Sequence, residues 1–439
     1  MSKQTLTTII IILVALTAGF FSYVYYQSRQ SGQAGGIVEV IKNIFPSGDI
    51  VPVITPPPDP STTGGETGGE TTGGELPVAA IPRLRHISTL HIAGLIPVER
   101  ERLLTNQPII ENTPSGAQTK PSTEVVTAVR YVEQETGHVL ESFVDRNDER
   151  KVSNTTIPRI YEAFFGDKGD SVIFRYLNDD DRTIESFTGS LPPTTLGGDE
   201  LPEFKGSLLP QNIPWLSISP DTTHFFYLLN FNSGIIGTTA LINGEKKSQI
   251  FNSEFTEWLP QWVNLKTIAL TTKPSASAPG FLYSLDTGTR AFTRVLGNIS
   301  GLTTLVSPDG KQVLYSVSSN NDINLRLYDV GSRTVETVSL KTLPEKCVWA
   351  KNNINIYCGV PNFLPNAPYP DDWYQGTISF SDALWKIDSS SGNTTIVTSP
   401  EFELGGASID IVSPMLSAKE NYIFFLNKKD QSLWSYALE

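Results

Sequence analysis

The sequence predicts an all-β protein, a seven-bladed β-propeller of four-stranded blades, preceded by one N-terminal transmembrane helix. Two observations in the 439-residue chain lead to this prediction. A hairpin pattern recurs at intervals near 43 residues from about residue 122 to the C-terminus. In addition, the run Leu6–Tyr26 has 21 residues and no charged side chain.

The hairpin pattern is clearest at Val306–Tyr315, which reads VSPDGKQVLY. Apolar residues alternate on both sides of Asp309-Gly310, and Asp-Gly between alternating runs is a strong β-hairpin signal. The pattern predicts two antiparallel strands, Thr304–Ser307 and Gln312–Ser316, joined by a type I′ turn. Such a turn needs a positive φ at both central residues.

Six further copies of the pattern align on Tyr315. The aligned residues are Tyr131, Phe174, Tyr227, Leu270, Cys358 and Phe425. Successive positions are 43, 53, 43, 45, 43 and 67 residues apart. Because a four-stranded propeller blade takes roughly 40–45 residues, seven copies predict seven blades.

A second hairpin follows the first in the clearest units. It consists of a strand, a short turn and another strand, which completes a four-stranded blade. The predicted pairs are Leu325–Val330 with Thr334–Val338, Phe281–Leu285 with Ala291–Val295, and Ala383–Asp388 with Thr394–Val397.

The motifs of these hairpins resemble those of the TolB-type, WD-like propellers. The first hairpin carries SPDG at Ser307–Gly310 and SPDT at Ser219–Thr222, and the third strand has an LYxxDxxxG pattern. The resemblance covers roughly residues 84–439 and implies the propeller fold. Such propellers serve as protein-binding platforms, as periplasmic scaffolds and as accessory domains of some peptidases, so the resemblance implies no single activity.

Leu6–Tyr26 is predicted to be a membrane anchor, since it is long enough to cross a hydrocarbon core of roughly 30 Å. The alternative is a cleaved signal peptide. However, the run exceeds the usual apolar length of about 7–15 residues for such a peptide. It also ends in five aromatic residues between Phe20 and Tyr26, which is typical of a membrane interface. These features favour the uncleaved anchor.

The predicted organisation has four parts. Residues 1–5 form a cytoplasmic tail, 6–26 a transmembrane helix, 27–81 a juxtamembrane segment with a Pro/Gly/Thr-rich linker, and 82–439 the propeller. The charges that flank the span, Lys3 and Arg29, give a weak orientation signal. The short N-terminal tail and the large acidic C-terminal part favour a cytoplasmic N-terminus. We therefore expect a single-pass protein of the cell membrane with an extracytoplasmic C-terminal domain.

The ring is predicted to close through residues 84–89. The last copy of the repeat ends at its third strand, Leu433–Leu438, so its blade lacks one strand. Leu84–Thr89 is a spare strand ahead of the first full blade. Adding it to the last blade removes a sheet edge that would otherwise stand open.

Three long insertions break the repeat, at 100–124, at 189–210 and at Pro361–Asp382. Long loops on a rigid scaffold are where propellers usually place function. The third insertion carries Asp371, Asp372, Trp373 and Tyr374, and these four residues are the predicted binding site. Two carboxylates beside two aromatic rings could bind a sugar or a protein. The alternative is a loop whose aromatic rings plug the blade edge while its aspartates face water.

Catalysis and metal binding find little support in the sequence. Nucleophilic catalysis needs a base, and the four histidines include no metal-binding pair and accompany no G-x-S-x-G motif. We expect His138 and His224 to be structural. The acidic run Asp179–Asp181 is read as a solvated turn, with a calcium site as the weaker alternative. The sequence indicates no cofactor and no metal site.

The two cysteines are predicted to form a disulfide. If Asn352-Asn353 is the turn that aligns with Asp309-Gly310, Cys347 and Cys358 lie directly opposite each other on neighbouring strands. Their Cα atoms would then be roughly 4.5–5.5 Å apart, which suits a disulfide. Two reduced core cysteines are the alternative, and the bridge is favoured if the domain lies outside the cytoplasm.

The formal net charge of −13 argues against nucleic acid and against anionic lipid surfaces as partners. We expect a non-catalytic binding or scaffold module for a protein or a cell-envelope polymer, acting through its loop-bearing face. The rival interpretation is a propeller-fold glycan hydrolase or lyase whose carboxylates meet over the channel. Convergence of two or more acidic or histidine side chains with shifted pKa values at one channel mouth would favour the enzyme.

Overall fold

The computed structural model describes residues 81–113, 116–191 and 204–438. The chain divides into two compact units, 1–77 and 78–439, and all described residues belong to the second. The predicted span Leu6–Tyr26 and nearly all of the predicted linker lie outside the described residues. Among the residues that are described, no helix is long and apolar enough to cross a membrane.

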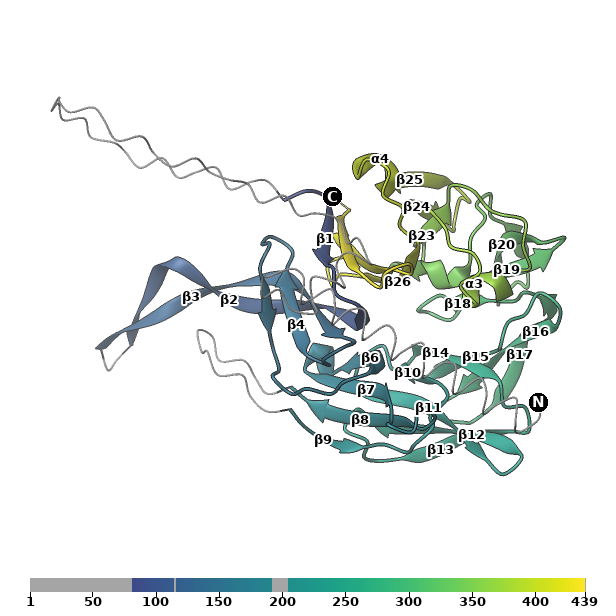
Figure 1. Ribbon diagram of the computed structural model, residues 1–439, viewed down its shortest axis with the longest axis horizontal. Helices are drawn as coiled ribbons and strands as arrows, with labels where there is room; N and C mark the ends of the chain where they lie inside the picture. Colours follow the sequence, from purple (N-terminus) through teal and green to yellow (C-terminus); the bar gives the residue numbers. More distant parts are fainter. Residues whose placement is uncertain (1–80, 114–115, 192–203, 439) are drawn as a thin grey trace, which may run out of the picture. The chain divides into compact units, whose positions relative to one another are not determined.

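The described residues form seven four-stranded antiparallel sheets, which are the blades of a β-propeller (Figure 1). Blade 1 contains β2 (Ile92–Thr113), β3 (Gly116–Glu133), β4 (Val139–Phe143) and β5 (Glu149–Lys151), and blade 2 contains β6 (Ile160–Gly166), β7 (Ser171–Leu177), β8 (Ile184–Ser190) and β9 (Lys205–Leu208). Blade 3 contains β10 (Leu216–Ile218), β11 (His224–Phe231), β12 (Gly234–Leu241) and β13 (Ser248–Ser253). Blade 4 contains β14 (Trp258–Asn264), β15 (Thr267–Thr272), β16 (Pro279–Asp286) and β17 (Phe292–Ser300).

Blade 5 contains β18 (Thr304–Val306), β19 (Gln312–Ser319), β20 (Asp322–Asp329) and β21 (Val335–Thr337). Blade 6 contains β22 (Cys347–Trp349), β23 (Asn355–Pro361), β24 (Asp382–Asp388) and β25 (Thr394–Thr398). Blade 7 contains β26 (Ile411–Leu416), β27 (Tyr422–Asn427) and β28 (Leu433–Ala437), together with β1 (Leu84–Ser88) from the start of the domain. In the described part of the chain, four short helical segments lie in the connections: η1 (Asp167–Gly169), η2 (Pro344–Lys346), α3 (Asp371–Tyr374) and α4 (Pro400–Glu403). The prediction of a seven-bladed, all-β propeller is confirmed.

The repeat that was aligned on Tyr315 marks the second strand of every blade. All seven aligned residues lie in such strands, and each is at most 2% exposed. A second strand has a hydrogen-bonded neighbour on both sides and packs against the adjacent blades, so it carries the most continuous apolar pattern. That is why this strand gives the clearest signal in the sequence.

The turn of the SPDG hairpin differs from the predicted type I′ geometry. The N–H of Gly310 donates to the carbonyl of Ser307 at 2.8 Å, so Pro308 and Asp309 are the central residues of the turn. Gly310 has a φ of 76°, whereas Asp309 is not in the left-handed region. Pro308 cannot be the first central residue of a type I′ turn, because its ring fixes φ at about −65° and such a turn needs a positive φ there. The strand register is nevertheless as predicted, with Thr304 opposite Tyr315.

The aspartate of the LYxxDxxxG pattern closes the outer turn of a blade. Asp329 Oδ1 accepts a hydrogen bond from the N–H of Ser332 at 2.7 Å. The equivalent Asp286 and Asp388 accept bonds from N–H groups two and three residues further on. These hydrogen bonds lower the pKa of all three carboxyl groups. The motif is therefore explained by turn formation.

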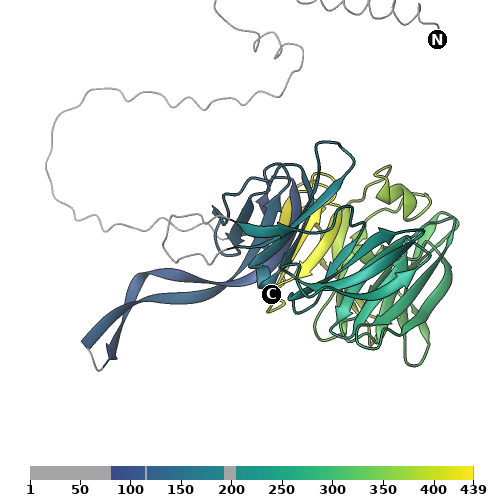
Figure 2. The same ribbon diagram turned by 90° about the horizontal axis from the view of Figure 1, so that it is seen from below.

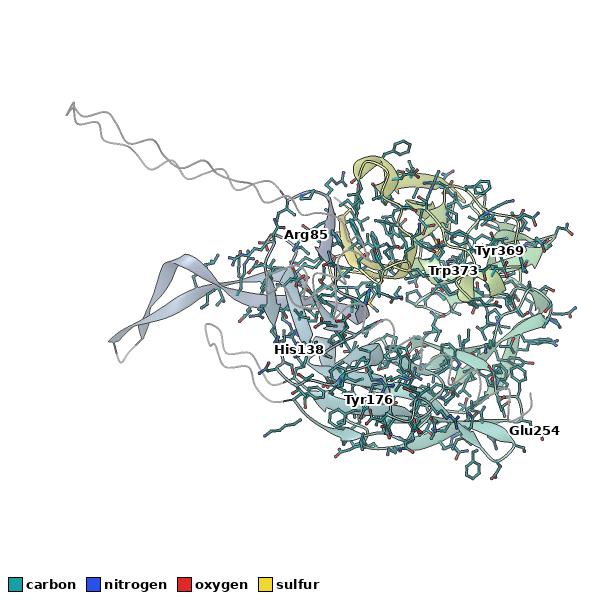
Figure 3. The ribbon with its side chains drawn as sticks, viewed as in Figure 1. Arg85, His138, Tyr176, Glu254, Tyr369 and Trp373 are labelled. Atoms are coloured by element: carbon teal, nitrogen blue, oxygen red, sulfur yellow. A yellow bond between two sulfur atoms is a disulfide. The ribbon has the colours of Figure 1, made fainter. Side chains whose placement is uncertain are left out.

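The predicted ring closure is confirmed. Strand β1 pairs antiparallel with β28, with Leu84 opposite Tyr436, and completes the last blade. Arg85, which is labelled in Figure 3, is a buried residue of the same strand. Its guanidinium donates to the carbonyl of Phe143 at 2.7 Å and to Ser142 Oγ at 2.9 Å, both in blade 1. One five-residue strand thus joins the last blade to the first.

The insertion predicted at 100–124 is not a loop. Strands β2 and β3 continue past the end of β4, which pairs with β3 only as far as Ala128, and form a two-stranded arm (Figure 2). Arg102 at the base of the arm donates to Glu124 and Asp145 at 2.7 Å each. Its guanidinium also lies over the ring of Phe143, 5.2 Å from the centroid. These contacts fix the base of the arm against blade 1.

Candidate functional site

The two ends of the propeller carry different connections. Because the strands of a blade are antiparallel, the turn between the second and third strands lies at the same end as the connection to the next blade. We call this end the upper end and the opposite one the lower end. The predicted site Asp371–Tyr374 forms helix α3 in the connection between β23 and β24, so it lies at the upper end.

The segment 362–381, which we call the strap, crosses from blade 6 to blade 4. Its Ala367 N–H donates to the carbonyl of Asn321 in blade 5 at 3.1 Å. Further along, the carboxylate of Asp371 accepts hydrogen bonds from Ser275 Oγ at 3.0 Å and from the N–H of Ala276 at 2.6 Å, both in blade 4. The Asp371 carboxylate therefore holds the strap in place.

Trp373 is buried, with 4% of its surface exposed, which agrees for this residue with the alternative of a ring that packs into the protein. Its indole N–H donates to Asp410 Oδ2 at 3.0 Å. The ring of Trp373, which is labelled in Figure 3, lies nearly parallel to that of Phe380. The ammonium of Lys346 is 5.2 Å from the centroid of the Trp373 ring. A buried indole needs a partner for its N–H, and Asp410 supplies it. Trp373 belongs to the packed core of the strap.

Solvent reaches Asp371, Asp372 and Tyr374 of the predicted site. Asp372 is partly buried, and Tyr374 is 40% exposed. The hydroxyl of Tyr374 turns inward and donates to Glu345. Burial of this hydroxyl and the neighbouring carboxylate raise the pKa of Tyr374 well above its usual value. The strap thus offers one partly exposed aromatic ring, and a binding role for these residues stays a prediction.

Beneath the strap lies a charged cluster that the sequence analysis missed. Lys346 lies between Asp382 and Asp410, and each of these three residues is at most 1% exposed. Burial raises the pKa of Asp382 to about 6, and Asp410 adds to the rise while Lys346 opposes it. Two carboxyl groups therefore do converge, and the pKa of one of them, Asp382, is raised. Because neither is open to solvent, they do not form a site that a polymer substrate could enter.

One signal in the sequence could have indicated this cluster. Lys346 precedes the first strand of blade 6, Asp382 begins its third strand, and Asp410 precedes the first strand of blade 7. All three positions lie at the upper end of a strand. Charged residues at such positions meet when their blades are neighbours.

The lower mouth of the central channel holds an apolar cavity of about 540 Å³. The first strands of blades 1, 2, 3, 6 and 7 line it. These strands contribute Leu95, Ile96, Pro97, Ala163, Phe164, Phe165, Ser217, Ile218, Val348, Trp349, Met415 and Leu416. The other lining residues follow the first strands of blades 3, 6 and 7 and are mostly polar: Ser219, Pro220, Thr222, Lys351, Ser417 and Glu420. Met415 is 39% exposed, so the apolar surface continues to the opening. A concave, mostly apolar lining is typical of binding pockets.

The charges at the rim of this cavity are paired with neighbouring groups. Lys351 donates its backbone N–H to Glu420 Oε1 at 2.5 Å and its ammonium to the carbonyl of Ala418 at 2.6 Å. Among the described residues that line the cavity, Glu420 is the sole carboxylate. The cavity therefore offers apolar contact rather than an acid–base pair.

The acidic turn of blade 2 is held by local hydrogen bonds. Asp180 Oδ1 accepts from the N–H groups of Arg182 and Thr183 at 2.9 and 2.8 Å, and Asp181 pairs with Arg159. Within the described ranges, no group of three or more His, Cys, Asp or Glu side chains could hold a metal ion.

The histidines contact structural neighbours. His138 Nε2 is 3.2 Å from Thr156 Oγ1, and His224 Nδ1 is 2.7 Å from Thr223 Oγ1. The His86 ring stacks on that of Trp434 with a centroid separation of 4.2 Å.

The predicted disulfide between Cys347 and Cys358 is present. The two residues are direct partners on β22 and β23, and their Cα atoms are 4.0 Å apart. Both are buried. The register derived from Asn352-Asn353 is correct, although Asn353 alone of that pair has a positive φ.

No protein-family model matches the sequence, and no curated protein matches it significantly. Solved structures do match. An oligogalacturonate lyase in complex with manganese is 9% identical with a TM-score of 0.46, over 78% of this chain and 98% of that protein. The β-propeller domain of the Trilobed protease from Pyrococcus furiosus is 12% identical with a TM-score of 0.45, over 72% and 94%. TolB from Acinetobacter baumannii is 12% identical with a TM-score of 0.40, over 78% and 79%. Identities this low concern the fold alone.

Proposed function

We propose that this chain is a membrane-anchored, extracytoplasmic binding module that holds a partner protein at the lower mouth of its channel. The observation that carries this proposal is the apolar cavity of about 540 Å³ formed by five first strands. Its exposed Met415 and its paired rim charges suit an apolar side chain or chain segment of a protein. The disulfide is consistent with an oxidising compartment.

A partner protein fits the cavity better than a glycan does. Sugars are bound by clusters of hydrogen-bonding groups, whereas the first-strand residues of this cavity are mostly aliphatic or aromatic. The two-stranded arm of β2 and β3 offers a second element for contact beside blade 1 (Figure 2). Binding through Asp372 and Tyr374 at the upper end is a separate prediction.

Site-specific photo-crosslinking in cells of the native host tests the proposal. A photoreactive residue replaces Met415 in the cavity or, as the matched control, Phe402 at the upper end, which is 86% exposed. We expect a discrete cross-linked protein at position 415 and none at 402. The Met415→Glu variant should reduce recovery of this protein about tenfold or more, because a buried unpaired charge is costly.

Two results would contradict the proposal. One is the same cross-linking pattern at both positions, which would indicate non-specific contact. The other is release of new reducing or unsaturated ends when the purified full-length protein is incubated with envelope polysaccharide. That second result would instead favour the glycan hydrolase or lyase.

A further inference from the structure

A lysine lies between two aspartates in the buried region beneath the strap. Lys346 Nζ is 2.7 Å from Asp382 Oδ2, contacts Asp410 Oδ1 and donates to the carbonyl of Ile411 at 3.0 Å. Lys346 and Asp410 are 0% exposed, and Asp382 is 1% exposed. Among the described residues, the three oxygens that contact this ammonium come from blades 6 and 7.

The two aspartates have different environments. Asp410 Oδ2 accepts hydrogen bonds from Trp373 Nε1 and from the N–H of Phe380, at 3.0 Å each. Asp382 Oδ2 accepts one from the N–H of Ile411 at 2.6 Å, whereas its Oδ1 is buried and accepts no hydrogen bond from any described residue. Burial also raises the pKa of Asp382 to about 6. Both carboxylate oxygens of Asp410 therefore have partners, whereas one oxygen of Asp382 has none among the described residues.

Aromatic rings enclose the lysine. Its Nζ lies 5.2 Å from the centroid of Trp373 and 5.1 Å from that of Phe380. Separated charges are costly in such surroundings, at several kcal/mol for each buried ion. A neutral amide in place of the Lys346–Asp382 ion pair would remove two of these buried charges.

We propose that Lys346 and Asp382 condense to an isopeptide bond, with Asp410 as the proton relay. The geometry points to it, because the amine nitrogen already contacts the carboxyl group of one aspartate and the second aspartate contacts the same nitrogen. The third observation is the buried Asp382 Oδ1 that lacks a hydrogen-bond partner.

The reaction balances without an oxidant or another reactant. Asp410 takes a proton from the Lys346 ammonium, and the free amine attacks Cγ of Asp382. One C–N bond forms and one C–O bond of Asp382 breaks. Two protons pass from the nitrogen through Asp410 to the departing oxygen, which leaves as water. Asp410 ends as a carboxylate, as it began.

The bond would link the start of the first strand of blade 6 to the start of its third strand. It would enclose the strap and lie next to the Cys347–Cys358 disulfide. This inference is independent of the proposed binding function, since no residue of the lower cavity takes part in it.

Mass spectrometry of the full-length protein, reduced and digested, tests the inference. We expect a cross-linked peptide that contains both Lys346 and Asp382 and is one water molecule lighter than the sum of its two component peptides. Lys346→Arg keeps the positive charge but should give only the unlinked peptides. Lys428→Arg is the matched control, because Lys428 also lies over the Trp373 ring, and it should leave the cross-link intact.

Asp410→Asn keeps the size of the side chain but removes the relay, so we expect it to leave Lys346 and Asp382 unlinked. Full recovery of the unlinked peptides from the wild-type protein overturns the proposal, and this result does not depend on how any variant folds. Fragmentation that places the bond at Asp410 overturns the choice of Asp382. A wild-type yield of cross-link in Asp410→Asn overturns the role of the relay.

Discussion

Strand β1 closes the propeller, so its removal should destabilise the domain far more than removal of the linker. We compare a protein that begins at residue 80 with one that begins at residue 92. The second lacks Leu84 and Ile87, which are 4% and 8% exposed, and the buried Arg85. Truncation of a buried Leu or Ile costs about 2–5 kcal/mol. Each hydrogen bond to a charged group adds about 1.5–3 kcal/mol.

Together these contributions amount to roughly 7–16 kcal/mol, which is comparable to the whole stability of a typical domain. We therefore expect the protein that begins at residue 92 to be unfolded or nearly so. Chemical denaturation followed by far-UV circular dichroism measures this. As point variants, Leu84→Ala should lower the free energy of unfolding by about 2–5 kcal/mol. The exposed Thr89→Ala control should change it by less than about 0.5 kcal/mol. Equal denaturation midpoints for the two truncated proteins would refute closure through β1.

Two further predictions concern the strap and the outer turns. Trp373→Ala should lower the free energy of unfolding by about 3–5 kcal/mol, because the ring belongs to the core and Asp410 loses a hydrogen-bond donor. Tyr374→Ala should lower it by about 1–2 kcal/mol. A Trp373→Ala protein with an unchanged denaturation midpoint would contradict the packing described. Asp329 has a lowered pKa in the folded state, so its stabilising effect is present above the unfolded pKa of about 4 and is lost as the pH falls through the folded pKa. Asp329→Asn keeps an oxygen that accepts the hydrogen bond from the N–H of Ser332, so it should lose less stability than the wild type between about pH 5 and pH 2. A series of thermal melts at different pH values would show this difference. Identical pH profiles would refute the role assigned to this carboxylate.

The blades could be predicted from the sequence because their signals are local. The alternation around Tyr315 and its six equivalents follows from strand geometry, and the near-constant spacing follows from repetition. The register of Cys347 and Cys358 could be predicted as well, since counting outward from a hairpin turn needs no long-range information. The prediction of a type I′ turn at Asp309-Gly310 is wrong, because the turn is centred on Pro308 and Asp309 and a proline cannot adopt the positive φ of that turn type.

The candidate site could be predicted less well because its contacts are long-range. Burial of Trp373 depends on Asp410, 37 residues further along the chain. Asp371 contacts Ser275, 96 residues earlier, so its carboxylate holds the strap to another blade. Exposure inferred from loop length alone cannot include such partners. The apolar lining of the lower cavity likewise comes from five blades and has no signature in any single one.

The arm of β2 and β3 replaces the loop predicted at 100–124. Its two strands pair with each other from Ile92 opposite Glu133 to Thr113 opposite Gly116, with register shifts on the way. Those shifts interrupt the alternation on which strand prediction depends.

The most direct test of an exported propeller is the state of its two cysteines in cells of the native host. The cells are lysed under denaturing conditions with an alkylating reagent, with or without prior reduction, and the peptides that contain Cys347 and Cys358 are analysed by mass spectrometry. Denaturation is needed because both cysteines are buried. We predict a disulfide-linked pair of peptides without reductant, and two alkylated cysteines only after reduction. Two freely alkylated cysteines without reductant would contradict both the bridge in the cell and the extracytoplasmic location.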